Sequence, residues 1–412
     1  MSSVSAASPT RPAAPRSAAA DGARVFERIE LRTSVAEADA VWRELLGEGV
    51  ATPYQTPAFL SAWADNVGRR EGVEIAIAIA RDAEGRAVAL LPLGVSRRFG
   101  LRVASYLGGT HVNYNLPVFA RDAVAAFTPP EVERLLREIA AAARVDLFAL
   151  SNQPESWRGA PNPLAGLPRQ PSPDFAYSGR LEASVEAHLK RYVSAKTRSA
   201  QRRKLRRFEE RGVVRIYRAE TDADRTHVLD AYFAQKAQRL AARGIDNVFA
   251  EPGVEDFIRA AAGLAAAPPA IDLYGFDLDG EVIATFGVIA DRDRMCGMFN
   301  SITSGDLARY SPGELLLTFM VEDAIGRGMT EFDLGVGAAA YKALFCADVD
   351  PLFDTILGVS PLGRAGAGVF AAKRAAKAWV KSNSAVYAFA TRIRKLRARD
   401  VERHAPAPAA ED

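Results

Sequence analysis

The same order of predicted elements occurs twice along this chain, and this repetition constrains the fold more than any other feature. Each half contains helices, a β-hairpin, a loop, a helix and a strand. The alternating apolar patterns predict the hairpins at residues 73–95 and 271–290. We expect a strand at residues 352–359 to close the second sheet. Mixed sheets flanked by helices fit this order, so the sequence predicts two related α/β halves.

Local composition predicts where these halves begin and end. Residues 152–173 are rich in Pro, Gly and Asn, which is typical of a linker. We therefore expect a first domain at residues 23–160 and a second at residues 174–363. The Ser, Ala and Pro of residues 1–22 predict a disordered tail. The basic and apolar residues of 366–402 predict a basic amphipathic helix.

The overall composition argues against several classes of protein. The net charge is only +3, so it does not indicate a nucleic-acid partner. Cys296 and Cys346 are too few for a disulfide framework, which favours a reducing, cytoplasmic compartment, and we expect both to be buried. No apolar run reaches the roughly 18 residues that span a bilayer. The four histidines are scattered, so we predict no metal site.

One predicted helix start has the chemistry of an anion site. Ser311 is expected to cap the helix, Pro312 fits its first position and Glu314 completes a capping box. Gly313 lets a ligand approach the backbone closely. Free amides at a helix start favour a phosphate or another anion. An ordinary capped helix has the same residues, and this remains the alternative.

Ionisable side chains follow this helix closely in the sequence. Asp333 lies between apolar neighbours on a predicted central strand, which is an unusual place for a charge. Tyr341 and Lys342 come shortly after the strand ends. Residues 311–345 therefore combine a predicted anion site, a sheet edge and groups that can transfer protons.

These motifs resemble a known family. SPGELLL and FDLGVGAAAYKALF (residues 311–317 and 332–345) resemble the C-terminal signature of the CelD/BcsL group of acetyltransferases, a cellulose-biosynthesis type with the GNAT fold. TPYQTPAFLSAW and LKRYVSAKTRSAQRRKLRRFEERG (residues 52–63 and 189–212) look like its N-terminal and central landmarks. FemABX-type aminoacyl transferases, which have tandem GNAT halves, are also similar. The resemblance covers roughly residues 23–363.

The resemblance implies a fold and an activity. The fold would be α/β (α+β), with two tandem GNAT-like domains, each a mixed, mostly antiparallel sheet flanked by helices. The activity would be acyl transfer from acetyl-CoA or another acyl-CoA to an amine or hydroxyl acceptor. Members are linked to cell-envelope polysaccharide synthesis, such as cellulose or exopolysaccharide. One departure is LARYSPG (residues 307–313), which has one glycine where the usual pyrophosphate loop has two small residues.

The family pattern implies a role for Tyr341, and residue type and position suggest roles for Lys342 and Asp333. Tyr341 matches the GNAT tyrosine that protonates the departing thiolate. Lys342 would bind a phosphate or carboxylate of the substrate as a point charge. Asp333 would act as a general base, or hold Lys342 or a backbone amide. The alternatives are a core tyrosine, a solvated lysine and a structural carboxylate.

Other residues are candidates for binding the two substrates. Ser311 and Gly313 would contact the donor's pyrophosphate, and Asn300 and Ser301 follow or end a strand beside that helix. Turn chemistry is the alternative for this loop. The acceptor, an envelope precursor, a sugar or an amine, would be bound by residues from both halves: His111, Asn113, Tyr114, Lys236 and Arg239. Solvated loop and helix positions are the alternative for these five.

A dense run of Lys and Arg at residues 190–211 remains to be explained. Such a segment can bind CoA phosphates, lipid headgroups, an anionic glycan or tRNA. It has few aromatic residues, which argues against base stacking and makes a nucleic-acid partner unlikely. Together with residues 366–402 it favours peripheral contact with the inner membrane face. Two other functions stay open: FemABX-like aminoacyl transfer, and a non-catalytic accessory role in polysaccharide assembly.

Overall fold

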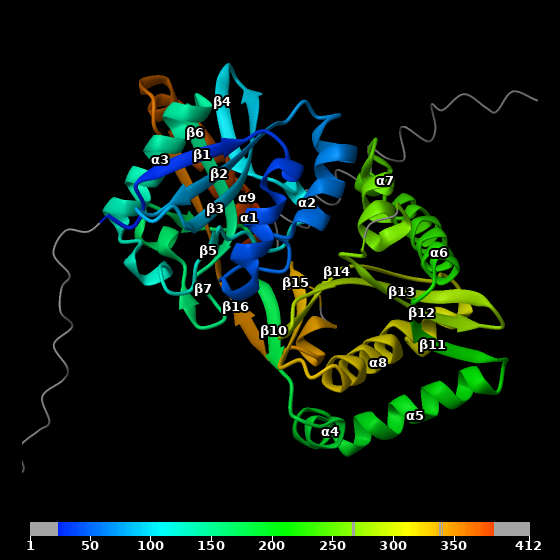
Figure 1. The fold of residues 1–412 in the computed structure, drawn as a ribbon. Helices are drawn as coiled ribbons and strands as arrows, with labels where there is room; N and C mark the ends of the chain where they lie inside the picture. The colour runs from blue at the N-terminus through cyan, green and yellow to red at the C-terminus, as the bar shows by residue number, and fades with distance from the viewer. Residues whose placement is uncertain (1–23, 266–267, 338, 340, 383–412) are drawn as a thin grey trace, which may run out of the picture.

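The computed structural model describes residues 24–265, 268–337, 339 and 341–382. The predicted tail at residues 1–22 and most of the predicted helix at residues 366–402, from 383 onward, lie outside this part. Two mixed sheets, one above the other in Figure 1, dominate the described residues. Within them, no helix is long and apolar enough to cross a bilayer.

The first sheet has the strand order β1-β2-β3-β4-β6-β17-β9, with β5 beside β3. Its strands are β1 (Arg28–Arg32), β2 (Glu74–Arg81), β3 (Ala87–Arg98), β4 (Leu101–Tyr106), β5 (Val118–Phe119), β6 (Leu147–Pro154), β9 (Gln170–Pro171) and β17 (Leu352–Gly358). A small separate ribbon pairs β7 (Ser156–Trp157) with β8 (Ala160–Pro161). All pairs of the first sheet are antiparallel except β4 with β6.

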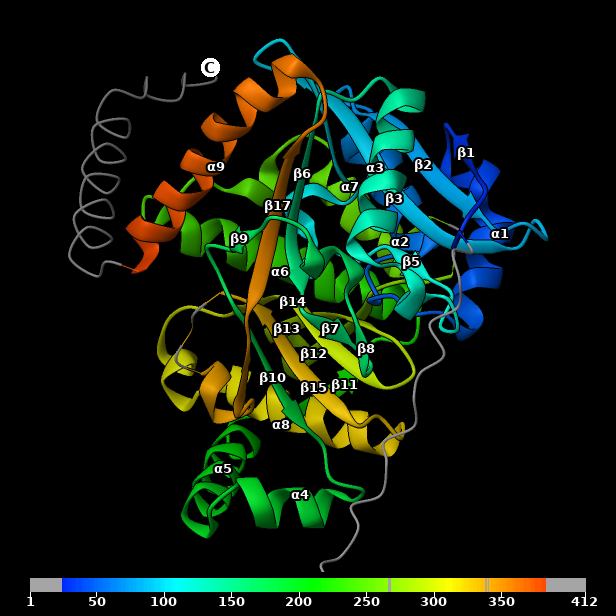
Figure 2. The same ribbon diagram turned by 90° about the vertical axis from the view of Figure 1, so that its left-hand side faces the viewer.

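Helices cover both ends of the first sheet. They are α1 (Val35–Glu48), α3 (Pro129–Ala143) and α9 (Pro361–Ser382), and α2 (Pro57–Trp63) packs on α1. Helix α1 packs on β1, β2 and β3, and α3 packs on β1 and β2. Helix α9 runs along β17, β6 and β4, as Figure 2 shows. Local sequence explains where two of them begin, because Ser34 and Thr56 accept hydrogen bonds from the amides of Glu37 and Phe59.

The second sheet has the strand order β11-β12-β13-β14-β15-β10-β16. Its strands are β10 (Ala176–Arg180), β11 (Val214–Arg218), β12 (Asp272–Leu278), β13 (Glu281–Ala290), β14 (Arg294–Ile302), β15 (Glu331–Val336) and β16 (Asp348–Asp350). Only β14 and β15 pair in parallel. The predicted hairpin is confirmed as β12 and β13, and its turn residues Asp279 and Gly280 both have positive φ, as a tight hairpin turn requires.

Helices surround the second sheet, some directly and some through other helices, since α4 packs on α8 and α7 packs on α2. They are α4 (Val185–Tyr192), α5 (Ala195–Glu209), α6 (Asp222–Ala241), α7 (Val254–Arg259) and α8 (Pro312–Gly326). Both α6 and α8 contact β12, β13 and β14, and Figure 1 shows them on opposite faces of the sheet. The same view places α4 and α5 beyond α8, away from the first sheet. Two mixed, helix-flanked sheets confirm the predicted α/β fold class.

The chain crosses between the two sheets twice. It leaves the first sheet after β9 and enters the second at β10, near the end of the predicted linker. It returns after β16, because β17 pairs with β6 and β9 of the first sheet. The prediction that residues 352–359 close the second sheet is therefore wrong. Strand pairing between residues about 200 apart is not visible in a local pattern.

The two halves share one apolar cluster on the α6 side, whereas the α8 face of the second sheet has a cluster of its own. Phe257 on α7 packs edge-to-face on Phe59 of α2, and its ring lies 5.4 Å from that of His111. Buried side chains form one cluster that runs from the first sheet to the α6 face of the second. Cys296 and Cys346 are both buried, as predicted. The halves are thus packed together, and residues from one can line a site in the other.

Candidate active site

The two parallel strands of the second sheet separate part way along their length. β14 and β15 pair only over Arg294–Cys296 and Glu331–Asp333. On its other side, β14 pairs Phe299 with Gly287 and Gly297 with Val288, so Met298 is the extra residue of a β-bulge. Beyond this point an opening forms in the sheet, with backbone groups of β14 facing it. Backbone amides in such an opening can polarise a carbonyl group.

A small cavity of about 110 Å³ occupies this opening. Tyr341 and Asn300, both predicted as site residues, line it together, and Asn300 Nδ2 donates a hydrogen bond of 3.0 Å to the Tyr341 hydroxyl. Burial raises the pKa of Tyr341. The phenol therefore stays protonated at neutral pH and is held in one orientation, which suits a proton donor.

Lys236 lines the same cavity from α6. Its ammonium donates a hydrogen bond of 3.3 Å to the Asn300 carbonyl oxygen and lies 5.1 Å from the centre of the Phe249 ring. Burial lowers the pKa of Lys236 to about 8, and the positive charges of Arg239 and Arg243 add to this effect. A substantial neutral fraction of this amine is therefore present near pH 8. Arg239 is close enough to act on Lys236 and Tyr341 electrostatically but does not line the cavity.

Asn113 reaches this opening from the first half. Its side-chain amide donates hydrogen bonds to the Gly297 carbonyl oxygen at 2.9 Å and to the Tyr54 hydroxyl at 2.8 Å. Gly297 is the first residue of β14 beyond the parallel pairing. Asn113 thus satisfies a carbonyl group that the separation of the strands leaves unpaired. This predicted substrate-binding residue lies at the cavity but is bound to protein groups.

Asp333 and Tyr114 do not line this cavity. Asp333 is fully buried and accepts hydrogen bonds from Arg294 Nη2 and from the Tyr114 hydroxyl, both at 2.5 Å, as well as from the Gly335 amide. Burial raises the pKa of Asp333, and Arg294 opposes that rise. These bonds tie the first half to β14 and β15. The predicted roles of Asp333 as a general base and of Tyr114 in acceptor binding do not fit these positions, because their polar atoms face each other and Arg294.

Lys342 lines the cavity but is held by the end of β15. Its ammonium donates hydrogen bonds to the carbonyl oxygens of Gly335 and Val336 at 3.1 and 3.0 Å. Burial lowers the pKa of Lys342, and Asp333 opposes that effect. Two of its three donors are therefore used to fix the chain between β15 and Tyr341. The prediction that it binds a substrate anion is not supported by this geometry.

The residues predicted to bind the donor also differ in position, because Asn300 lines the cavity whereas Ser301 and Ser311 do not. Ser301 is buried, and its hydroxyl donates a hydrogen bond of 2.8 Å to Gln235 on α6 rather than facing the cavity. Ser311 has φ of 56° and makes no side-chain cap, so the predicted capping box is wrong. Glu314 instead pairs with Lys204 of α5 at 2.5 Å. Packing of α5 on α8 thus overrides the local cap.

The start of α8 has few amides to offer an anion. Those of Ser311 and Glu314 are hydrogen-bonded to the carbonyl oxygens of Ala308 and Ser311, and Pro312 has none. Gly313 remains, and a Cβ at that position would lie 3.0 Å from Ile302. The backbone anion site predicted from the sequence is therefore small.

Three arginines that the sequence analysis did not single out together surround the loop before α8. Arg207, Arg211 and Arg309 lie 5.5, 4.7 and 5.0 Å from the centre of the Tyr310 ring. The Arg211 guanidinium also donates a hydrogen bond of 2.9 Å to the Tyr310 hydroxyl. Two of these cations come from the basic segment at residues 190–211. Only the tertiary packing brings that segment to this loop.

His111 lies in another place. It lines a larger cavity in the first half, of about 710 Å³, and not the opening between β14 and β15. Burial lowers the pKa of His111 to about 4, so the ring is neutral at pH 7. The structure therefore separates His111 from Tyr341, Asn300 and Lys236.

Comparisons with known proteins agree with this geometry. Residues 195–343 match the family model for the acetyltransferase (GNAT) domain. A search of curated proteins gave no match. Residues 195–343 include α6, α8 and the separated strands β14 and β15. Residues 195–343, which carry most strands of the second sheet, are thus similar to a GNAT acetyltransferase domain.

Solved structures resemble the chain over most of its length. FemX has 11% sequence identity and a TM-score of 0.54, covering 83% of this chain and 100% of that one. The C-terminal domain of a putative lysylphosphatidylglycerol synthetase from Agrobacterium fabrum has 13% identity and a TM-score of 0.50, covering 82% and 96%. A conserved protein of unknown function from Bacteroides thetaiotaomicron has 12% identity and a TM-score of 0.51, covering 79% and 99%. At these identities the likeness concerns the fold alone.

Proposed function

We propose that this protein is an acyltransferase that moves an acyl group from acyl-CoA to an amine or hydroxyl acceptor. The observation that carries the proposal is the opening between β14 and β15, where Tyr341 and Asn300 are hydrogen-bonded beside the bulge at Met298. The match of this region to a GNAT acetyltransferase domain supports the same reading.

The reaction needs no covalent enzyme intermediate. The acceptor nitrogen or oxygen attacks the thioester carbonyl carbon, the carbon–sulfur bond breaks, and the thiolate leaves. Backbone amides beside Met298 would stabilise the negative charge on the carbonyl oxygen. Tyr341 would donate its proton to the thiolate, and neutral Lys236 would accept the proton that the acceptor loses.

The phosphates of the donor need a site as well. We propose that Arg207, Arg211 and Arg309 supply the positive charge that the loop before α8 lacks in backbone amides. Guanidinium groups bind phosphate oxygens in a bidentate manner. This arrangement would place the pyrophosphate outside the opening and the thioester within it.

The cellular role remains a proposal from sequence. The resemblance of residues 311–345 to the CelD/BcsL group favours cell-envelope polysaccharide synthesis, with an envelope precursor as acceptor. The exposed arginines of α5, such as Arg202 and Arg206, favour peripheral contact of a cytoplasmic enzyme with the inner membrane face. We propose both on these grounds.

A second candidate is FemABX-like transfer from aminoacyl-tRNA. The exposed cations of α5 and the fold likeness to FemX favour it. A preference for aminoacyl-tRNA over acyl-CoA in binding would separate the two candidates.

Calorimetric titration with acetyl-CoA and a long-chain acyl-CoA tests the proposal. The wild-type protein is expected to bind at least one of them, and Arg211→Glu is expected to weaken that binding about tenfold, because replacing a charge-assisted phosphate contact by a repulsive charge costs about 1.4 kcal/mol. Arg202→Glu is the matched control, because it makes the same charge change on α5. If α5 continued as far as residue 211, positions 202 and 211 would lie on opposite faces of the helix. Absence of binding to both thioesters would refute the acyl-CoA proposal.

A further inference from the structure

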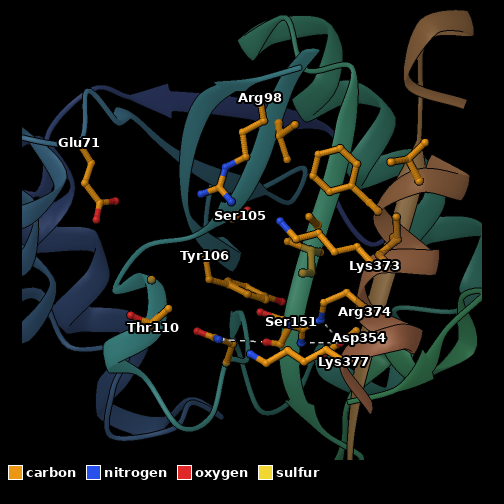
Figure 3. Close-up of a pocket in the computed structure, with 18 of the residues that line it drawn as sticks. Glu71, Arg98, Ser105, Tyr106, Thr110, Ser151, Asp354, Lys373, Arg374 and Lys377 are labelled. Carbon is orange, nitrogen blue, oxygen red and sulfur yellow. Dashed lines mark hydrogen bonds and ion pairs between the residues drawn. The ribbon is translucent and has the colours of Figure 1, made fainter. Parts of the chain in front are cut away.

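The first half contains a cavity that the proposed transfer reaction does not use. It measures about 710 Å³ and lies between strands β4, β6 and β17 and helix α9. Figure 3 shows its walls, with Ser105 and Tyr106 from the sheet and Lys373, Arg374 and Lys377 from α9. Ligand pockets in proteins typically measure about 300–1,000 Å³. The size therefore suits a small organic ligand.

Three buried polar atoms in the lining have no hydrogen-bond partner among the described residues; one, Arg374 Nη2, forms an ion pair with Asp354, and the other two have no partner there. These two are Trp63 Nε1, a donor, and Asn115 Oδ1, an acceptor. Both residues are only 3% exposed. The Asn115 amide nitrogen is already used, since it donates to the Ser151 carbonyl oxygen at 3.0 Å. Buried polar atoms are nearly always hydrogen-bonded, so each of these two atoms indicates a bound water or a polar group of a ligand.

One wall of the cavity is positively charged. Arg98, Lys373, Arg374 and Lys377 all line it, as Figure 3 shows. Asp354 is the acid on this wall, and it is bound by Arg374 Nε at 2.6 Å. Among the described residues, Arg98 donates one side-chain hydrogen bond, to the Ser96 hydroxyl at 3.2 Å, and neither Arg98 nor Lys373 forms an ion pair. Glu71 also lines the cavity but lies on its far side in Figure 3. The wall therefore carries positive charge that the described residues do not neutralise.

Apolar side chains stand next to these cations. Ile356 of β17 and Val369 and Phe370 of α9 line the cavity, and Phe370 packs edge-to-face on Phe99 at 6.1 Å. Phe99, at the turn between β3 and β4, is 81% exposed. A large exposed aromatic at the mouth of a charged cavity suits a ligand that has an apolar part.

We propose that this cavity binds a phosphate-bearing amphiphile. The phosphate would contact Arg98 and Lys373, because a phosphomonoester carries a charge of about −1.5 to −2 and so balances two cations better than a carboxylate does. The apolar part would lie along Ile356 and Phe370, and a polar group of the ligand would bond to Trp63 Nε1 and Asn115 Oδ1.

This ligand site is distinct from the transfer site. The two cavities share no lining residue. They are joined by one short segment, in which His111 lines the first cavity and Asn113 binds the Gly297 carbonyl oxygen at the second. The proposal does not depend on the nature of the acyl donor.

Fluorescence titration of the full-length protein with dodecyl phosphate, below its micelle concentration, tests the site through Trp63. Dodecyl maltoside is the neutral probe of the same chain length. We expect dodecyl phosphate to bind at least tenfold more tightly than the maltoside. Lys373→Glu should weaken the binding of dodecyl phosphate at least tenfold, and Ser105→Phe, which fills the cavity without changing charge, should do the same.

Arg364→Glu is the matched control, because it makes the same charge change on α9 but lies nine residues from Lys373, on the opposite face. Its affinity should equal that of the wild type, and circular dichroism verifies that each variant is folded. Equal affinity for phosphate and maltoside, an equal loss in Arg364→Glu, or no binding by the wild type would overturn the proposal. Displacement of dodecyl phosphate by acetyl-CoA would also overturn it, since the cavity would then hold the donor.

The ligand could be a lipid headgroup or a free phosphate compound. Sedimentation with phosphatidylcholine vesicles, with and without phosphatidylglycerol, distinguishes these two sources. Binding to the anionic vesicles that Ser105→Phe abolishes would identify a lipid headgroup. Binding of dodecyl phosphate without vesicle binding would identify a free phosphate compound. Either result supports the site.

Discussion

Replacing Arg294 by leucine should destabilise the protein more than any surface charge change. Arg294 Nη2 lies 2.5 Å from Asp333 and 2.8 Å from Asp350, and Nη1 lies 3.1 Å from Glu331. The Asp333 side chain is 0% exposed, whereas those of Asp350 and Glu331 are 35% and 43% exposed. Solvent screens the two exposed pairs, so each contributes only about 0–1 kcal/mol.

The buried pair therefore determines the size of the effect. Removing one partner of a buried ion pair costs about 3–5 kcal/mol, because the remaining charge is left without compensation. Arg294→Leu should lower the free energy of unfolding by that amount. Urea denaturation followed by tryptophan fluorescence measures it, since the Arg294 guanidinium lies 4.6 Å from the centre of the Trp157 ring.

The loss should also depend on pH. Burial raises the pKa of Asp333 in the folded state, and Arg294 opposes that rise. Without Arg294 the folded-state pKa is higher still, so the carboxyl group binds a proton more tightly in the folded than in the unfolded chain. Its contribution is then most favourable below the unfolded pKa of about 3.9 and is lost as pH rises through the folded pKa. The destabilisation at pH 8 should exceed that at pH 5.

Two controls make this prediction specific. Arg86→Leu removes an exposed arginine that pairs with Asp82 and Asp122, and it should cost no more than about 1 kcal/mol. Asp333→Leu combined with Arg294→Leu removes both buried charges and should recover much of the loss. If Arg294→Leu costs as little as Arg86→Leu, the reasoning about the buried pair is wrong.

Three further predictions concern the opening between β14 and β15. Tyr341→Phe should lower kcat by about 10²- to 10⁴-fold, the usual effect of losing a proton donor, without changing the Kd for acyl-CoA; unchanged kcat would exclude the tyrosine as the acid. The pH profile of kcat/KM should rise through about pH 8 as Lys236 loses its proton, and Lys236→Met should abolish that limb; a profile that survives the substitution would contradict the assignment. Gly335→Ala should destabilise the protein by about 1–3 kcal/mol, because Gly335 has a positive φ of 71°. It should also reduce activity, because the added Cβ would collide with the Asn113 amide. Gly337→Ala, whose φ is 97° and whose Cβ would meet no atom within 4 Å, should show the strain in a thermal melt but keep its activity; equal losses of activity in both variants would contradict the contact.

Local elements were readable from the sequence because their signals are local. The hairpins of β2 with β3 and of β12 with β13 both follow from alternating apolar residues. Tyr341 and Asn300 were each predicted as site residues, and both line the same cavity. These features depend on residues close in sequence or on a motif of a known fold.

Features that depend on distant pairing were not predicted. Arg294 follows two charged turn residues and looks like part of the turn, yet it is the buried partner of Asp333. Glu314 matches a capping box, yet it pairs with Lys204. In both cases a charge finds a partner from a different element, and the gain from pairing it in a partly buried place exceeds the small energy of a local turn or cap.

The sequence by itself determined the two α/β halves, their hairpins and the segment that carries Tyr341, because periodicity, turn residues and motifs act within short stretches of chain. The tertiary structure decided which sheet β17 joins, which groups surround Asp333 and where Asn113 reaches. It also decided that Arg207, Arg211 and Arg309 meet around Tyr310, and that a cavity in the first half faces cations of α9. These outcomes are set by contacts between residues tens to hundreds of positions apart, whose free energies depend on burial and geometry that no local pattern encodes.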